Sequence, residues 1–252
     1  MLEIDLTTVK PDLRKILLIG MEGVGKTNFI KTMPRPIYIF SCDKGYQTLA
    51  GEDKITVGLC MDEDRNRPHA YADFMLKFDA LQKGLKYKNK DGSEEPYKTI
   101  AIDPITFLAN FLLDHIQKIG NNVDKKPGYE GYGFLKSRLQ DVLNKTIMIS
   151  EYVVCTALLD TDKDENTGEL FFVPNIIGST KNEIGAWFDA VFYMMVDKDN
   201  NGNKKYYMLT VGDRRQKAKL RLPSNIANLI SAREEPDYQI LINKINQITQ
   251  TK

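Results

Sequence analysis

The chain has 252 residues, of which 42% are hydrophobic and 27% charged. This composition is typical of a globular protein with one large α/β domain and a sizeable core. Lysine and arginine total 35 and aspartate and glutamate 34, so the overall charge predicts neither a nucleic-acid nor a membrane partner. We expect no secretion signal and no membrane span, because no run of 18 apolar residues occurs. Cys42, Cys60 and Cys155 follow no metal-binding spacing; Cys42 and Cys155 lie in apolar runs and are expected to be buried and reduced, as in the cytoplasm.

The first predicted elements are a strand and a glycine-rich loop. Residues 15–19 form a short apolar run, and residues 20–27 read Gly-Met-Glu-Gly-Val-Gly-Lys-Thr, which matches G-x-x-x-x-G-K-[ST] without a mismatch. A helix is predicted after the loop, to about Met33, because Pro34 and Pro36 stop it. A strand before the loop and a helix after it are the context in which this motif binds phosphate.

Each fixed position of the loop predicts a contact with a polyphosphate. Gly20, Gly23 and Gly25 allow a tight turn that points backbone N–H groups at phosphate oxygens. Lys26 places a positive charge near the β- and γ-phosphates, and Thr27 offers its hydroxyl to Mg²⁺. The N-terminus of the following helix favours the same anion. We predict a site for ATP and Mg²⁺ whose binding residues are Gly20, Met21, Glu22, Gly23, Val24, Gly25, Lys26, Thr27 and Asn28.

Strands and helices alternate over about the first 160 residues. Further strands are predicted at residues 36–40, 55–57, 99–103, 152–157, 190–196 and 205–211. Helices are predicted at residues 71–84, 104–119 and 132–144, and exposed loops at 86–98, 121–131 and 160–169. This order predicts an α/β fold with a mostly parallel central sheet flanked by helices. Ligands bind such sheets at the carboxyl ends of the strands.

The chain is predicted to be one domain over residues 1–252, with a lead-in at 1–14 and a core at about 14–225. Asp-Asn-Asn-Gly at 199–202 predicts a C-terminal β-hairpin between the last two strands. The sequence from Pro223, including a tail at about 226–252, is predicted to be helical. Its apolar stripe is predicted to consist of Ile240, Leu241, Ile245 and Ile248.

Asp103 is the predicted second metal-binding side chain. It ends the apolar strand at 99–103, and hydrolysis by a P-loop protein needs Mg²⁺ that is held by the loop threonine and by an acid on a neighbouring strand. We therefore predict Asp103 as the Walker B acid beside Thr27. Capping of the helix that starts at Pro104 is a second role, compatible with the first.

Four segments, at residues 16–27, 36–45, 97–103 and 218–221, resemble in order and spacing the phage-encoded, AAA-type nucleotide-binding proteins. These have a minimal RecA-type core and act in single-strand annealing or recombination. The resemblance covers roughly residues 14–225. It implies a RecA-like P-loop NTPase fold and an ATPase that forms homo-oligomers, in the cytoplasm of a bacterial host.

The resemblance also implies catalytic roles for Asp43, Lys219 and Arg221. Asp43 matches an acid that polarises the attacking water; the alternative is an ordinary turn aspartate. Lys219 and Arg221 match a Lys-x-Arg pair that reaches the ATP of a neighbouring subunit, where it stabilises charge on the phosphoryl group; the alternative is a solvated basic strand.

Leu158 departs from the family pattern, in which a polar residue after Thr-Ala of the fourth strand senses the γ-phosphate. Either Thr156 performs this task, or hydrolysis is coupled differently, or turnover is weak. The two histidines, His69 and His115, are not placed to substitute.

Binding of single-stranded DNA is suggested by residues 214–221, of which five in eight are basic. A solvated charged face is the commoner reason for such a run. Tyr129 and Tyr132, in a glycine-rich segment, are candidates to stack on bases, or they pack over the following helix.

Three functions remain open. The first is an oligomeric, DNA-dependent ATPase of the RecA type. The second is a binding protein whose nucleotide state switches a partner, with little turnover and no direct DNA contact, which Leu158 favours. The third is a small-molecule kinase, which would need a substrate lid; the loop at 86–98 is the candidate.

Overall fold

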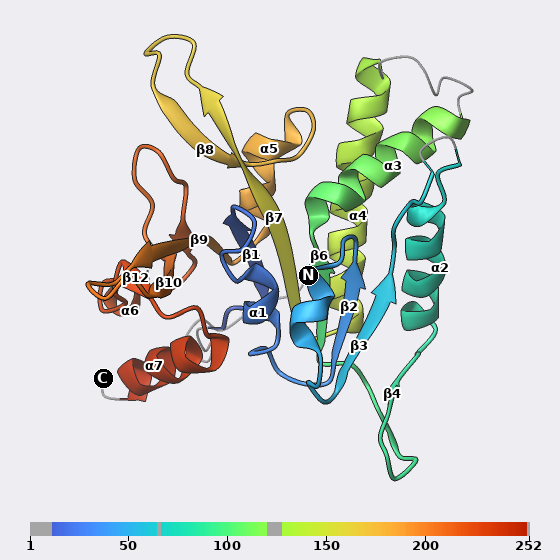
Figure 1. Ribbon diagram of the computed structural model, residues 1–252, viewed down its shortest axis with the longest axis horizontal. Helices are drawn as coiled ribbons and strands as arrows, with labels where there is room; N and C mark the ends of the chain where they lie inside the picture. The colour runs from blue at the N-terminus through green and yellow to red at the C-terminus, as the bar shows by residue number, and fades with distance from the viewer. Residues whose placement is uncertain (1–11, 65–66, 120–127, 251–252) are drawn as a thin grey trace, which may run out of the picture.

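The computed structural model describes residues 12–64, 67–119 and 128–250, and it has an α/β architecture (Figure 1). The strands are β1 (Lys15–Gly20), β2 (Ile37–Ser41), β3 (Ile55–Leu59), β4 (Tyr87–Lys88), β5 (Glu94–Glu95), β6 (Thr99–Asp103), β7 (Tyr152–Lys163), β8 (Leu170–Pro174), β9 (Ala190–Lys198), β10 (Lys204–Leu209), β11 (Lys219–Leu220) and β12 (Arg233–Glu234). The helices are α1 (Lys26–Ile30), α2 (Ala70–Gln82), α3 (Ile105–Ile119), α4 (Tyr129–Ile149), α5 (Thr180–Glu183), α6 (Ser224–Ala227) and α7 (Tyr238–Gln250), with 3-10 helices η1 (Gly45–Leu49) and η2 (Ile184–Trp187).

The central sheet is mostly parallel, as predicted. Its strands follow the order β12-β10-β9-β1-β7-β6-β2-β3, and every pair from β9 to β3 along this path is parallel. The strands β8, β10 and β11 run antiparallel to their neighbours. Strands β2 and β6 are buried at every residue, because helices cover both faces of a parallel sheet.

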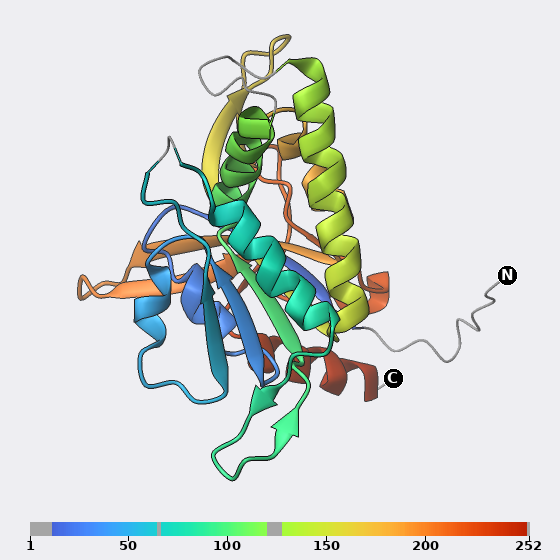
Figure 2. The same ribbon diagram turned by 90° about the vertical axis from the view of Figure 1, so that its right-hand side faces the viewer.

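Two helical layers cover the sheet (Figures 1 and 2). Alternate residues of β1 point to opposite faces. Leu17 and Ile19 belong to the apolar cluster that α2, α3 and α4 complete. Ile16 and Leu18 belong to a second cluster, completed by α1 and α7. The β1 strand is therefore buried between two cores, and this fixes the start of the glycine-rich loop in space.

The register of the sheet brings the carboxyl ends of β1, β2 and β6 to one edge, beside Leu158 of β7. Ser41 of β2 pairs with Asp103 of β6, and Gly20 of β1 pairs with Leu158 of β7. The glycine-rich loop and the segments that follow β2 and β6 consequently meet at this edge, which is where a nucleotide site was predicted.

The elements around the loop match the predictions with small shifts. Helix α1 ends at Ile30 rather than near Met33, since Thr32 and Met33 bond three residues back in single turns. Cys42 and Cys155 are buried, as predicted. The predicted loop at 86–98 contains the small hairpin β4–β5, and Gly92 in its turn has a φ of 85°, a conformation that favours glycine.

The prediction of a loop at 160–169 is wrong in part. Strand β7 continues to Lys163 and pairs with β8, so that only the residues from 164 to 169 form the turn. Asp164 closes this turn by accepting hydrogen bonds from the backbone N–H groups of Asn166 and Thr167. The acidic residues at 160–163 suggested a loop, but pairing with the apolar β8 outweighs their weak strand propensity.

The C-terminal tail also differs from the prediction. The β9–β10 hairpin forms around the predicted turn, but the segment after α6 includes the strand β12, which pairs with β10. In α7, the buried positions are Tyr238, Leu241 and Ile245, whereas Ile240 is 45% exposed. Spacings of three and four residues place the buried set on one helix face.

Two further predictions concern the segment before α4 and the start of the chain. Residues 121–127 of the predicted loop, and 1–11 of the lead-in, lie outside the described residues. Tyr129 begins α4, so the helix starts earlier than predicted.

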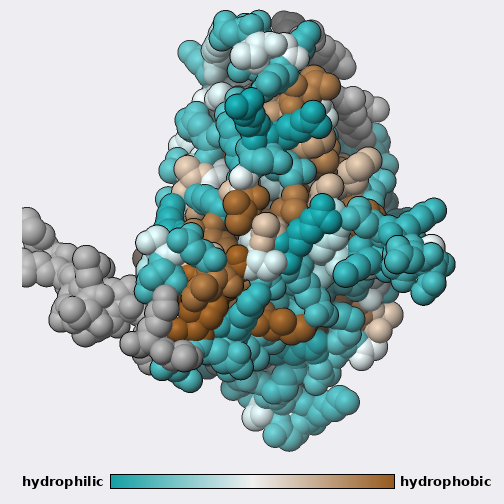
Figure 3. Space-filling model, turned by 90° about the vertical axis from the view of Figure 1, so that its left-hand side faces the viewer, coloured by the Kyte–Doolittle hydropathy of each residue, from teal (hydrophilic) through white to brown (hydrophobic). Residues whose placement is uncertain are grey.

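Of the described helices, none has the length and apolar character of a membrane span. Seen from the left of Figure 1, the surface is mostly hydrophilic with apolar patches (Figure 3).

Candidate functional site

The glycine-rich loop connects β1 directly to α1. Gly23 and Gly25 have φ values of 74° and 89°, which side chains rarely tolerate. Gly20 is needed for another reason: a Cβ there would stand 2.8 Å from the carbonyl oxygen of Met194 on β9 and 2.8 Å from Val24 Cγ2. The first glycine of the motif therefore allows close packing, and the other two allow the turn.

Lys26 is the cation of the loop, and it is buried, with 8% of its surface exposed. Its Nζ donates to the carbonyl oxygens of Gly20 and Met21, at 2.8 and 2.7 Å. Burial lowers the pKa of Lys26, while the nearby carboxylates, Asp103 first and then Asp43, oppose this shift. The loop itself therefore holds the ammonium in place. A polyphosphate bound in the loop would place its negative charge next to this group.

Asp103 is held by two threonines. Its Oδ2 accepts a hydrogen bond of 2.8 Å from Thr27 Oγ1, and its Oδ1 accepts one from the hydroxyl of Thr156, which is fully buried. Asp103 itself is 3% exposed. Burial raises the pKa of this carboxyl; the two threonine hydrogen bonds act in the opposite direction. The structure therefore brings together the two predicted metal-binding side chains, Thr27 and Asp103.

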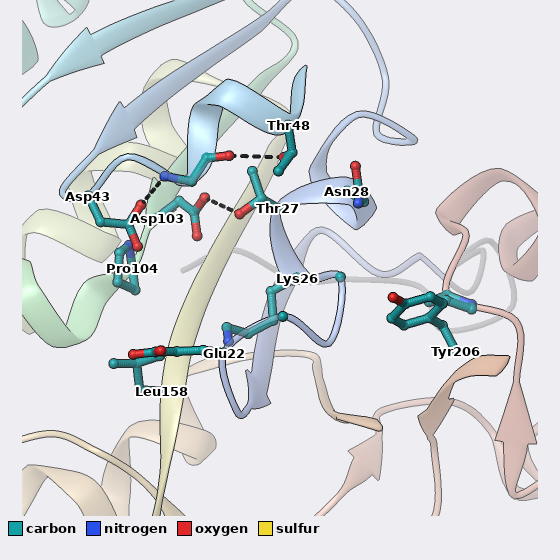
Figure 4. A pocket seen from close by; sticks show the side chains of 14 residues that line it. Glu22, Lys26, Thr27, Asn28, Asp43, Thr48, Asp103, Pro104, Leu158 and Tyr206 are labelled. Atoms are coloured by element: carbon teal, nitrogen blue, oxygen red, sulfur yellow. Dashed lines mark hydrogen bonds between the residues drawn. The ribbon is translucent and has the colours of Figure 1, made fainter. Parts of the chain in front are cut away.

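Asp43 follows β2 at the same edge (Figure 4). Its Oδ1 accepts a hydrogen bond of 2.7 Å from the backbone N–H of Gly45. A Cβ at Gly45 would stand 2.9 Å from Asp43 Oδ1 and 3.1 Å from Thr27 Oγ1. A glycine is therefore required where the segment after β2 passes over Thr27, and this close approach holds Asp43 beside the loop.

These groups line one pocket of about 400 Å³. Its lining residues are Glu22, Gly23, Gly25, Lys26, Thr27, Asn28, Asp43, Gly45, Thr48, Asp103, Pro104, Leu158, Tyr206 and Pro236. Of the predicted binding residues, Met21 is 66% exposed and Val24 is packed in the core. Neither lines the pocket, nor does Gly20, which packs against β9.

The donor set fits a nucleotide with its metal. The oxygens of Thr27 and Asp103 are hard ligands of the kind that Mg²⁺ prefers. The buried cation of Lys26 and the turn at Gly23 and Gly25 suit a polyphosphate. Among the described residues, no group of three or more His, Cys, Asp and Glu side chains is arranged to hold a metal by itself. Metal binding here would therefore be completed by phosphate oxygens and water.

A family model described as an AAA domain, AAA_24, matches residues 13–222. The chain belongs to the AAA_24 family. This match covers β1, the loop, Asp43, Asp103 and β11, and together with the mostly parallel sheet it confirms the predicted fold class. The chain is a P-loop protein of the AAA type. No curated protein matches the chain significantly.

Three solved structures show distant similarity to this AAA_24 protein. The flagellar accessory protein FlaH from Methanocaldococcus jannaschii is 10% identical, with a TM-score of 0.37 over 79% of this chain and 78% of FlaH. A KaiC-like protein from Pyrococcus horikoshii OT3 is 13% identical, with a TM-score of 0.40 over 82% and 83%. The type III secretion ATPase EscN from enteropathogenic E. coli is 12% identical, with a TM-score of 0.44 over 72% of this chain and 43% of EscN.

Leu158 lines the pocket of this AAA_24 protein as an apolar residue. Its backbone N–H donates to Thr106 Oγ1 at 3.0 Å, and its carbonyl accepts from the N–H of Asn175. Thr156, which was one alternative for sensing the γ-phosphate, is fully buried with its hydroxyl on Asp103. Thr156 therefore positions the carboxylate of Asp103, the predicted Walker B acid.

Lys219 and Arg221 do not converge on the pocket of their own chain. The N–H of Arg221 donates to the carbonyl of Asp189, whose own N–H donates to the carbonyl of Lys15. Arg221 is consequently level with the amino end of β1, whereas the loop starts at the carboxyl end of β1, about 17 Å along the strand. The guanidinium pairs with Asp189 at 3.4 Å and is 59% exposed.

The candidates for DNA contact lie on different elements and have different surroundings. The phenyl ring of Phe171 on β8 lies under the ammonium of Lys217, 5.6 Å from the ring centroid, so part of the basic segment has an aromatic partner. Tyr129 is 98% exposed at the start of α4. Tyr132 packs instead against Gly178, where a Cβ would stand 3.4 Å from its ring.

Sequence reasoning did not find several lining residues, namely Gly45, Thr48, Tyr206 and Pro236. Of these four, only Gly45 stands in a local sequence pattern that could have indicated its position. It follows Asp43 by two residues, and Asp-x-Gly is a common turn pattern. The others come from η1, β10 and the segment before α7. No sequence pattern connects these segments to the loop, because they are brought together only by the sheet.

Proposed function

We propose that this AAA_24 protein binds ATP and Mg²⁺ in the pocket of Lys26, Thr27 and Asp103 and hydrolyses the ATP. We further propose that it works as a homo-oligomer on single-stranded DNA, in recombination or annealing, in the cytoplasm of a bacterial host. The observation that carries the nucleotide part is the hydrogen bond of 2.8 Å between Thr27 and Asp103, beside the buried Lys26. The DNA part rests on the sequence resemblance and on the basic segment at 214–221.

Chemical roles follow from position. Lys26 neutralises phosphate charge, and Thr27 and Asp103 hold the metal. Bound Mg²⁺ would neutralise negative charge that develops between the β- and γ-phosphates. Asp43 lines the same pocket and is proposed to orient the attacking water as a general base. Leu158 contributes no hydrogen-bonding side chain on the β7 side of the pocket, and we therefore expect slow turnover.

The proposed trans role of Lys219 and Arg221 needs a second subunit. Arg221 follows β11 and is level with the amino end of β1, Lys219 of β11 is level with Leu17 in the middle of β1, and neither lines the pocket of its own chain. An exposed guanidinium in such a place can act on nucleotide only when a neighbour presents its pocket to it. Assembly is therefore part of the proposed catalytic mechanism.

The kinase alternative loses its candidate lid. The hairpin β4–β5 precedes the first residue of β6, and Lys54, which precedes β3, pairs with Glu95 at 2.9 Å. Both connections place the hairpin at the amino ends of the strands, where it projects from the body of the fold (Figure 1). Asp103 and the pocket lie at the opposite ends. The binding-switch alternative keeps the support of Leu158.

The deciding measurement is ATP hydrolysis with and without single-stranded DNA over a salt series. Stimulation that declines with salt supports the DNA-dependent ATPase, and binding of ATP without stimulated turnover supports the switch. Mixing Arg221→Ala with Asp43→Ala tests the shared site, because each mixed interface can combine one intact Asp43 with one intact Arg221. If the mixture is no more active than its components, the trans role is wrong.

A further inference from the structure

A second cavity of about 820 Å³ adjoins the phosphate pocket. The two share three lining residues: Asn28 of α1, Tyr206 of β10 and Pro236, which precedes α7. Asn28 directly follows the metal-binding Thr27. The second cavity therefore begins where the loop ends, on the side of α1.

Tyr206 lies at one end of the phosphate pocket. In Figure 4, the side chains of Asp43 and Asp103 lie on one side of Thr27, and Tyr206 lies well apart on the other. The ring of Tyr206 also passes close to the loop, because a Cβ at Gly25 would stand 3.7 Å from its Cδ1. Tyr206 is 38% exposed, so one part of a large aromatic side chain remains accessible beside the loop.

Pro236 is held rigidly in the same region. Before it, Glu234 of β12 pairs with Met208 of β10. After it, the N–H of Tyr238 donates to Thr32 Oγ1 at 2.9 Å, which ties the start of α7 to the end of α1. Tyr206 and Pro236 are thus supplied by elements that are bonded to one another and to α1.

We propose that Tyr206 and Pro236 form the binding site for the aromatic base of the nucleotide, with Tyr206 stacking on the base. This inference rests on the proposed function, since it assumes that the polyphosphate occupies the loop. The metal-bearing end of the polyphosphate is fixed by Thr27 and Asp103, so the nucleoside must leave the pocket at its other end, past Asn28. The groups that it meets there are Tyr206 and Pro236, and flat apolar surfaces of this kind stack on bases.

The proposal separates affinity for the base from affinity for the phosphates. Replacing Tyr206 by alanine should weaken the binding of Mg²⁺-ATP about 10- to 100-fold, which is the range of a lost base–aromatic stack. Binding of inorganic tripolyphosphate, which has no base, should stay unchanged. Tyr206→Phe should keep most of the affinity for ATP, because stacking needs the ring and not the hydroxyl.

The experiment is calorimetric titration of the wild type, Tyr206→Ala, Tyr206→Phe and the control Tyr129→Ala, each with Mg²⁺-ATP and with Mg²⁺-tripolyphosphate. Tyr129 is 98% exposed on α4, away from the pocket, and its variant should bind both ligands as the wild type does. Equal losses for both ligands in Tyr206→Ala would show a structural role and overturn the base site. A wild type that binds neither ligand would instead refute the proposed function.

A second measurement gives a direct optical signal. The chain has a single tryptophan, Trp187, so the double variant Trp187→Phe with Tyr206→Trp places the only indole at the proposed base site. Stacking with a base should quench its fluorescence on addition of ATP, and tripolyphosphate should not. Equal responses to the two ligands would contradict a base at this position.

Discussion

Thr27 Oγ1 donates a hydrogen bond of 2.8 Å to Asp103 Oδ2, across 76 positions of the sequence. This bond joins the first turn of α1 to the last residue of β6, although β7 lies between β1 and β6 in the sheet. Thr156 of that intervening strand bonds the other oxygen of the same carboxylate. The carboxylate of Asp103 is therefore oriented from both sides by hydroxyl groups on two different elements.

Substitution of Lys26 should abolish nucleotide binding without unfolding the protein. Lys26→Met keeps the apolar stem in its buried position and removes the ammonium that bonds the carbonyls of Gly20 and Met21. We expect ATP affinity to fall at least about 100-fold, since a charge-assisted phosphate contact contributes about 1.5–3 kcal/mol and the loop loses its internal anchor. Titration with a fluorescent ATP analogue measures this, and unchanged binding would disprove the phosphate site.

Asp103→Asn should change how stability depends on pH. Because burial raises the pKa of Asp103, the folded state holds its proton more tightly than the unfolded chain does. The ordinary pKa of this carboxyl, which applies to the unfolded chain, is 3.8. As the pH rises from this value through the raised pKa of the folded state, the protein loses stability. The loss is about 1.4 kcal/mol for each pH unit that separates the two pKa values. The free energy of unfolding of Asp103→Asn should exceed that of the wild type by more at pH 7.5 than at pH 3.5, below the ordinary pKa of 3.8. Urea unfolding at both values tests this, and a constant difference would contradict it.

Thr156→Val should destabilise the protein and weaken the metal site together. The valine removes the hydroxyl that bonds Asp103 Oδ1, and loss of a buried hydrogen bond to a charged group costs about 1–3 kcal/mol. It should also raise the pKa of Asp103 further, because this bond acts to lower it. Thr156→Ser keeps the hydroxyl and serves as the control. If serine and valine weaken Mg²⁺-dependent ATP binding equally, the hydroxyl has no positioning role.

Two glycine substitutions should have opposite effects on stability. Gly20→Ala places a Cβ 2.8 Å from a backbone oxygen of β9 and should cost about 1–3 kcal/mol through overpacking. Gly133→Ala lies within α4 with no atom within 4 Å of the new Cβ. It should stabilise the protein by about 0.5–1 kcal/mol. Thermal unfolding of the two variants measures whether each one lowers or raises the free energy of unfolding. A Gly20→Ala variant as stable as the wild type would contradict the packing argument.

Local sequence was sufficient to identify the elements that carry phosphate chemistry. The apolar run at 15–19, the glycines of the loop and the strand ending in Asp103 lie where they were predicted. Each is specified by short-range rules: hydrophobic runs for buried strands, and glycine where φ must be positive. The extension of β7 and the strand β12 were missed, since weakly patterned segments take their structure from the partners that they pair with. On α7, burial of Leu241 and Ile245 was predicted correctly, burial of Ile240 was wrong, and burial of Tyr238 was missed.

The sequence by itself determined that the chain has a phosphate-binding loop, a carboxylate at the end of a neighbouring strand and an α/β sheet to hold them. Only the tertiary structure decided that Thr156 orients Asp103, that Tyr206 and Pro236 adjoin the loop, and that Arg221 lies at the opposite end of β1. The physical reason is that the loop is encoded by consecutive residues, whereas these relationships depend on strand order and register. Strand order and register are in turn set by the burial of the two apolar faces of the sheet, to which residues from the whole chain contribute.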